Sequence, residues 1–181
     1  MKFEDAQKEM SFSYFGGGTG VLVSGLVWCL AGSAALLYSN RLSMLTLFFG
    51  GLLIHPAAML LAKMFKRPGN HSPNNPLAKL ALESAIILFL AFYVAKLQVE
   101  WFYPIMLMTI GVRYLVFNTL YGSRVYWLLG ALLLFSGMLC IILGADFVIG
   151  AFIGGSIEVI FSLVILNQSK GIYIKQPKFY G

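Results

Sequence analysis

Six long apolar stretches constrain this chain more than any other feature of its sequence. Each has about the 20 residues that an α-helix needs to cross the hydrocarbon core of a bilayer. Lipid offers backbone groups no hydrogen-bond partners, and the stretches lack the alternating pattern of barrel strands. The sequence therefore predicts an all-α membrane protein, a six-transmembrane-helix bundle with short loops, whose helices cover residues 17–38, 42–64, 76–96, 102–121, 125–144 and 147–166.

The composition also favours a membrane environment. Hydrophobic residues make up 59% of the 181 positions and charged residues only 11%, whereas about a quarter of the residues in soluble domains are charged. We expect one integral membrane domain over residues 1–181. It comprises an interfacial N-terminal segment (1–16), the bundle (17–166) and a basic, aromatic cytoplasmic tail (167–181).

The N-terminal segment has a helical pattern of its own. Phe3, Gln7, Met10 and Tyr14 recur at helical spacing, which predicts a short helix lying at the membrane surface. The glycine cluster that begins at Gly16 is then suited to act as a hinge into the first span, because glycine adopts backbone conformations that other residues avoid.

Basic residues are distributed unevenly over the two sides of the predicted bundle. With six spans, both termini and the 2–3 and 4–5 loops share one side, which carries ten of the thirteen basic residues. The opposite side has Arg41 and Lys96, and Arg113 lies within a span. The positive-inside rule therefore predicts that both termini are cytoplasmic. The net charge of +6 thus reflects orientation rather than nucleic-acid binding, and the lysines of the tail fit either anionic inner-leaflet lipid or a solvated segment.

Four ionisable side chains fall inside the predicted spans: His55, Glu83, Arg113 and Glu158. Each costs roughly 2.5–3.5 kcal/mol on insertion scales, so such residues normally face the bundle interior and have partners. Counting from the span ends places all four in the middle of the membrane or its cytoplasmic half. We therefore expect them to line one polar cavity that is open to the cytoplasm.

The last span has the clearest geometry. Gly150, Gly154, Glu158 and Ser162 recur every four residues and so share one helix face. Small residues on that face permit close helix packing, and Arg113 lies at a similar depth to Glu158. Glu158 is the natural partner of Arg113, although the sequence leaves Glu83 open as the alternative. The pair serves either a ligand site or only the packing of the helices.

The remaining candidate residues have weaker patterns. His55 precedes Pro56, which predicts a kink where a histidine could relay protons, although a neutral imidazole bonded to a neighbouring helix explains it as well. Glu83 follows Lys79 by one turn, and the two alternatively form an ordinary solvated pair. Tyr114 and Asn118 continue a polar stripe from Arg113 towards the cytoplasm.

No motif for a known chemistry is present. The chain has no nucleotide-binding glycine pattern, no metalloprotease or nucleophile-elbow motif, and only two histidines. Cys29 and Cys140 lie inside predicted spans and are expected to be packing residues rather than metal ligands or a disulfide. We therefore predict no catalytic residue, no metal and no cofactor.

Four phrases carry a resemblance over nearly the whole chain: "GGTGVLVSGLVW", "LTLFFGGLLIHP", "NPLAKLALES" and "EWFYPIMLMTIGVRYLVFNTLYG". They resemble a family of bacterial membrane proteins of unknown function that are about 180 residues long, close to the 181 residues of this chain. These phrases include His55, Glu83 and Arg113 but not Glu158. The resemblance implies a bacterial inner-membrane protein and brings no activity with it.

Three hypotheses for function remain at this point. The first is binding or transport of a small solute or ion through the polar cavity, with a proton-linked cycle as one form of it. The protein would then be a homo-oligomer whose interfaces are the glycine faces of the first and last spans. The second is a structural or accessory membrane protein whose buried charges only fix helix packing. The third is an intramembrane enzyme acting on a lipid, with His55 and Glu83 as an acid/base pair.

Overall fold

A computed structural model describes residues 2–69, 71–83, 93–94 and 97–170, with side chains except at 81–83 and 170. The described part is helical, as predicted, and five of its helical segments are long and apolar enough to cross a membrane. Most of the predicted third span lies outside the described residues. The elements are α1 (Phe3–Ser13), η1 (Phe15–Gly17), α2 (Gly18–Leu37), α3 (Asn40–Met64), α4 (Pro76–Glu83), η3 (Val99–Trp101), α6 (Phe102–Tyr121), α7 (Val125–Ile142) and α8 (Phe147–Lys170).

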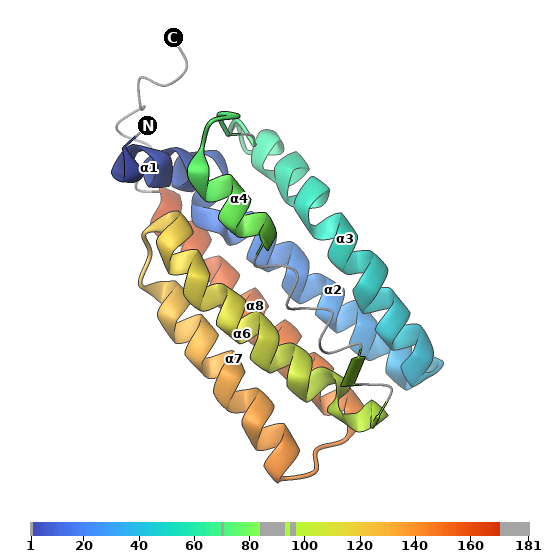
Figure 1. The fold of residues 1–181 in the computed structure, drawn as a ribbon. Coiled ribbons are helices and arrows are strands. Elements are labelled where there is room, and N and C mark those ends of the chain that lie inside the picture. The colour runs from blue at the N-terminus through green and yellow to red at the C-terminus, as the bar shows by residue number, and fades with distance from the viewer. Residues whose placement is uncertain (1, 70, 84–92, 95–96, 171–181) are drawn as a thin grey trace.

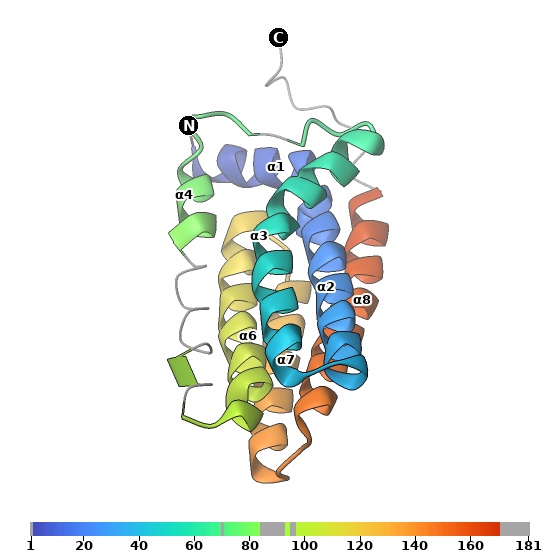
Figure 2. The same ribbon diagram turned by 90° about the vertical axis from the view of Figure 1, so that its right-hand side faces the viewer.

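The long helices run antiparallel to their chain neighbours, because the turns between them are short. Helix α2 lies between α3 and α8, and α6 packs along α7 (Figure 1). Helix α8 also contacts α6 and α7, so it joins the two halves of the bundle. The N-terminus, the end of α3, the α6–α7 turn and the end of α8 all lie at one end of the molecule (Figures 1 and 2).

Glycines allow the central helices to approach closely. A Cβ atom on Gly155 of α8 would lie 2.6 Å from the Cys29 Sγ and 3.0 Å from the Gly25 carbonyl oxygen of α2. Gly111 of α6 and Gly130 of α7 face each other in the same way. The glycine faces of the first and last spans are therefore occupied within one chain, and they do not form the oligomer interfaces that we expected from the sequence.

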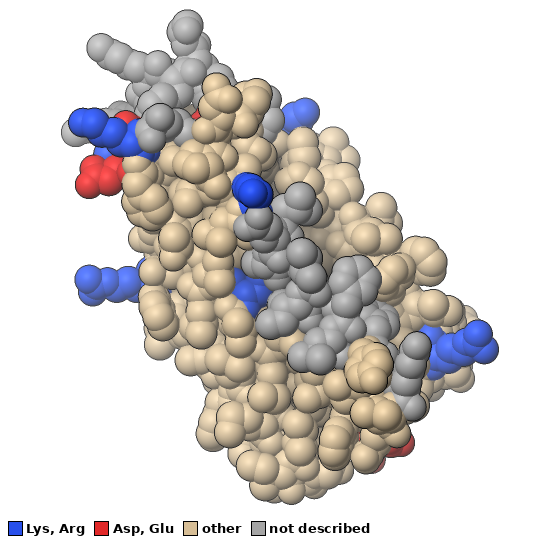
Figure 3. Space-filling model, viewed as in Figure 1, with Lys and Arg blue, Asp and Glu red and all other residues tan. Residues whose placement is uncertain are grey.

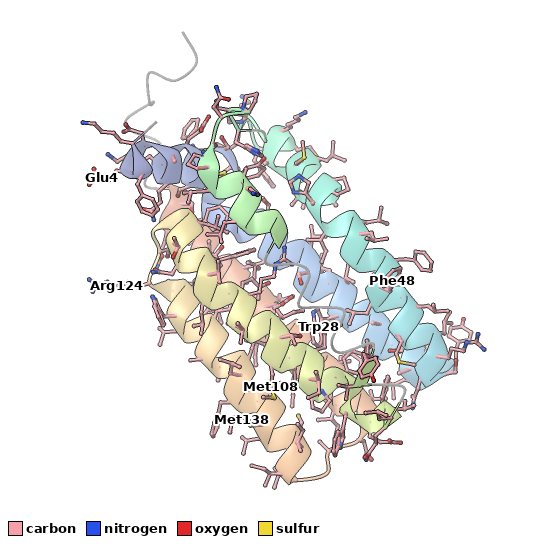
Figure 4. The ribbon with its side chains drawn as sticks, in the orientation of Figure 1. Glu4, Trp28, Phe48, Met108, Arg124 and Met138 are labelled. Atoms are coloured by element: carbon pink, nitrogen blue, oxygen red, sulfur yellow. The ribbon has the colours of Figure 1, made fainter. Side chains whose placement is uncertain are left out.

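The end of the bundle far from the N-terminus has an aromatic core. Trp28 of α2, Tyr103 of α6 and Phe147 of α8 are buried, and the Tyr103 ring lies 5.5 Å from the Trp28 ring and 4.7 Å from the Phe147 ring. The hydroxyls of Tyr103 and Ser43 are 2.5 Å apart, and Ser43 also donates to the Ala31 carbonyl at 2.6 Å. Figure 4 shows Trp28 between the helices, whereas Arg124 points outwards.

Helix α1 lies across the other end of the bundle (Figure 2), so the short N-terminal helix predicted from the sequence is present. Gln7 donates to the Thr119 carbonyl of α6 at 2.8 Å. The buried Glu9 accepts from the Ser72 backbone N–H at 2.8 Å and from the Asn75 side-chain amide at 2.7 Å. Asn75 also caps α4 by accepting from the Leu77 backbone N–H, and Pro76 takes the first helical position, where its missing N–H removes no helix hydrogen bond.

Charged side chains gather mainly towards the two ends of the molecule, and the surface between them is largely uncharged (Figure 3). Large apolar side chains are exposed along this middle zone, including Leu30, Leu53 and Phe135. In water such a surface would drive association, whereas lipid tails solvate it. The distribution is that of a multi-pass membrane protein.

Candidate functional site

Glu158 is the most deeply buried acidic or basic residue of the described bundle. It lies near the middle of α8, and its side chain is fully buried. The Tyr114 hydroxyl of α6 donates to Glu158 Oε1 at 3.0 Å, and Ser24 of α2 lies beside the same carboxylate. The other oxygen, Oε2, is buried and meets no hydrogen-bond partner among the described residues. A buried polar atom in this state costs about 1–3 kcal/mol.

Arg113 lies one residue before Tyr114 but does not reach the carboxylate. The described side chains of Arg113 and Glu158 form no ion pair, although Arg113 is near enough for its charge to act on the carboxyl group. The guanidinium carbon is 5.3 Å from the centre of the Phe117 ring, one turn further along α6. Successive residues of a helix point about 100° apart, so Tyr114 can face Glu158 only if Arg113 is turned aside.

A cluster of aromatic rings connects the Glu158 site with the α1 end of the bundle. The Tyr114 and Tyr126 rings are stacked at 5.9 Å, and the Tyr126 and Tyr121 rings at 5.6 Å. The Tyr126 hydroxyl donates to the Gly16 carbonyl at 2.6 Å, just after α1. Tyr126 and Ser24 were not candidates in the sequence, where Tyr126 begins a span as many interfacial anchors do.

Asn118 lies in the last turn of α6 and bonds across the α6–α7 connection. With its amide oriented to satisfy both partners, it donates to the Ser123 carbonyl and accepts from the Trp127 indole, each at 3.0 Å. Tyr121 is half-buried in the aromatic cluster. The polar residues predicted to follow Arg113 along one face therefore have different roles. Tyr114 faces Glu158, whereas Asn118 stabilises the α6–α7 turn.

His55 lies on a different side of the bundle from Glu158. It is exposed on α3, which stays helical through Pro56, and its ring lies 6.3 Å from the Tyr14 ring. Tyr14 in turn bonds to His71 Nδ1 at 2.8 Å. His55 thus belongs to a group with Tyr14 and His71 beneath α1, and its link to the Glu158 site is through the charge of Arg113, which acts on both residues.

The small residues predicted on the Glu158 face of α8 contact other helices. A Cβ atom on Gly150 would lie 2.7 Å from Tyr103 Cβ, and one on Gly154 would lie 2.6 Å from the Trp28 ring. The Ser162 hydroxyl donates to the Val159 carbonyl of its own helix at 2.6 Å. The Glu83 side chain and residues 171–181 of the predicted lipid-binding tail lie outside the described residues.

The described residues contain no group of three metal-ligating side chains. A shallow apolar hollow on α8 is lined by Val148, Ile149, Phe152, Ile153, Ser156 and Ile157. It includes none of the predicted cavity residues. The chemistry of the site is therefore that of one carboxyl group, one phenol and nearby hydroxyl, thiol and guanidinium groups.

Comparison with known proteins gives a family without an assigned activity. Residues 3–168 match DUF7010, a family of unknown function, so the chain belongs to that family. The match covers α1 and nearly all of α8, and it confirms the resemblance noted in the sequence. No curated protein and no solved structure matches the chain.

Proposed function

We propose that this member of the DUF7010 family binds a proton at Glu158 within the membrane and couples that binding to the binding or transport of a small solute or ion. The observation that carries the proposal is the fully buried carboxyl group, with one oxygen bonded to Tyr114 and the other without a hydrogen-bond partner in the described part of the chain. A charge in this position is destabilising, so ionisable residues inside a membrane usually serve a function.

The packing around Glu158 favours a proton as the species bound there. One turn before Glu158, side chains of Trp28 and Leu107 fill the space beside Gly154. The groups beside the carboxyl are Tyr114 of α6 and Ser24 and Cys29 of α2, and Arg113 of α6 acts on it only through its charge. A proton needs no additional volume, and Oε2 can accept it while Oε1 keeps its bond to Tyr114.

We place the protein in a bacterial inner membrane with both termini in the cytoplasm. This orientation puts α1, with its exposed Lys2 and Lys8, at the cytoplasmic surface, where anionic lipid attracts lysine. The carboxyl of Glu158 then lies about midway between the two surfaces, since it is near the centre of α8. Tyr114, Tyr126 and Tyr121 lie on its cytoplasmic side.

A structural or accessory role is the second candidate, and the contacts of Asn118 and the close-packed glycines favour it. In that case Glu158 would keep one protonation state and would only position helices. The two functions therefore differ in whether the carboxyl group titrates in the folded protein.

Infrared difference spectroscopy on protein in nanodiscs tests the proposal. We expect acidification to produce the band of a protonated carboxylic acid, and this band to be missing from Glu158→Gln. Glu100→Gln is the matched control, because Glu100 is exposed in η3 and should not contribute a buried-acid band. A spectrum that is unchanged by Glu158→Gln would overturn the proposal in favour of the accessory role.

Thermal unfolding with a panel of inorganic ions, small organic acids and small organic amines tests the coupling. A compound that binds the folded state raises the unfolding temperature. We expect this rise to depend on pH in the wild type and not in Glu158→Gln. If no compound produces a pH-dependent rise, the solute-coupling part of the proposal is wrong.

A further inference from the structure

The connection between α1 and α2 is a strained hinge. Phe15, Gly16 and Gly17 have φ angles of 52°, 61° and 82°, so three successive residues are left-handed. Glycine tolerates this conformation, but a bulky residue such as Phe15 does so at a cost of order 1–3 kcal/mol. The surrounding contacts must hold the hinge in place, and a change in those contacts would release it.

Tyr126 of α7 provides a direct contact to this hinge. Its hydroxyl is buried and donates to the Gly16 carbonyl at 2.6 Å. A Cβ atom on Gly17 would collide with the same hydroxyl and with the Tyr121 ring. The hinge backbone thus packs directly against Tyr126 and Tyr121, and its position depends on the positions of those two rings.

The other face of Tyr126 leads to Glu158. The Tyr126 ring stacks on the Tyr114 ring, with 28° between their planes, and Tyr114 donates to the carboxyl group. Glu158, Tyr114, Tyr126 and Gly16 therefore form a continuous series of contacts from the middle of α8 to the root of α1. All four residues are buried.

We infer that Tyr126 couples the charge of Glu158 to the position of α1, so that α1 acts as a cover over this end of the bundle. The inference rests on the proposed function, because it requires Glu158 to gain and lose a proton. Helix α1 is suited to be the moving part, since only the short η1 segment joins it to α2. A small apolar cluster around Ala6 and Met10 and the polar contacts of Gln7 and Glu9 hold it against the bundle.

The coupling follows from the strength of one hydrogen bond. A hydroxyl bonded to a carboxylate is held about twice as strongly as one bonded to a neutral group. When Glu158 is neutral, Tyr114 is held less firmly and the stacked Tyr126 ring can shift. The Tyr126 bond to Gly16 then weakens, and the strained backbone at Phe15 relaxes with α1 loosened from the bundle.

Amide hydrogen exchange of residues 3–13, measured on protein in nanodiscs, tests this inference at constant pH. Glu158→Gln removes the charge and keeps an oxygen acceptor for Tyr114. We expect it to speed exchange in α1 by about two- to tenfold, the change that corresponds to weakening one ordinary hydrogen bond. Tyr126→Phe should give a similar increase, because Phe cannot donate to Gly16.

The double variant decides between coupling and independent effects. If Tyr126 carries the coupling, Glu158→Gln adds no further exchange in the Tyr126→Phe background. The inference would be overturned if the exchange rate of the double variant rose by the product of the two single increases. It would also be overturned if Glu158→Gln alone left the exchange rate of α1 unchanged. Tyr103→Phe is the matched control: it removes a hydroxyl contact to Ser43 at the far end and should leave α1 exchange unchanged.

The infrared and exchange measurements separate this inference from the proposed function. A Glu158 band together with uncoupled α1 exchange refutes only the role of Tyr126. If the band is missing, Glu158 does not titrate and the proposed function and this inference are both wrong.

Discussion

Among single residues, we expect the hydroxyl group of Tyr114 to stabilise the folded protein in addition to the packing of its ring. Tyr114→Phe would leave both oxygens of Glu158 without the hydrogen bond that the structure records. Because hydrogen bonds to charged groups contribute about 1.5–3 kcal/mol, we expect a loss of that size in the free energy of unfolding. Chemical denaturation in detergent measures it.

Tyr38→Phe is the control for this substitution, because the Tyr38 side chain is 75% exposed at the end of α2. It should change stability by less than about 0.5 kcal/mol. Equal effects of the two substitutions would mean that the Tyr114 hydroxyl does not stabilise the carboxyl group. The Glu158 site would then lack its main polar contact.

The direction of single side chains in the Glu158 site could be predicted from the sequence only in part. Helical spacing placed Glu158 on a face with Gly150 and Gly154, and all three face neighbouring helices in the structure. The partner was less predictable, because Arg113 and Tyr114 are adjacent in sequence and helix rotation decides which of them faces α8. Depth along a span can be counted from sequence, but rotation about the helix axis depends on packing.

At the scale of elements, the α2–α8 contact should not tolerate a methyl group. Gly155→Ala would put Cβ 2.6 Å from Cys29 Sγ and 3.0 Å from the Gly25 carbonyl, so the helices would have to separate. Overpacking of this kind typically costs about 1–3 kcal/mol. We expect a correspondingly lower unfolding temperature in detergent.

Gly51→Ala is a matched control on α3, because a Cβ atom there meets nothing within 4 Å. Alanine is the better helix former by roughly 0.8–1.0 kcal/mol, so this variant should be as stable as the wild type or more stable. If Gly155→Ala behaved like Gly51→Ala, the close approach of α2 and α8 would not be a determinant of the fold.

The elements show which parts of the fold are readable from sequence. Apolar length predicted the five spans that the structure describes, and the spacing of Phe3, Gln7, Met10 and Tyr14 predicted α1. The docking of α1 was not predictable, because it depends on Glu9, Ser72 and other groups far apart in sequence. The exposure of His55 was not predictable for a related reason: depth does not reveal that one side of α3 is exposed.

At the scale of the whole molecule, the proposed orientation makes the two ends chemically distinguishable. Arg124 is exposed in the α6–α7 turn near α1, and Asp146 is exposed in the α7–α8 turn at the opposite end (Figure 1). In a Cys29→Ala, Cys140→Ala background, we expect a membrane-impermeant maleimide to label Asp146→Cys in intact bacteria. Arg124→Cys should be labelled only after the cells are permeabilised.

The reason for this expectation is the distribution of basic residues, since ten of thirteen lie on the side predicted to be cytoplasmic. Replacing Arg124 removes one of these charges and leaves the bias in place. Labelling of Arg124→Cys but not Asp146→Cys in intact cells would show that the orientation is the reverse of the one proposed. The α1 end of the bundle would then lie at the outer surface. Labelling of both positions from one side would contradict α7 as a membrane-crossing helix, because α7 is the only span between them.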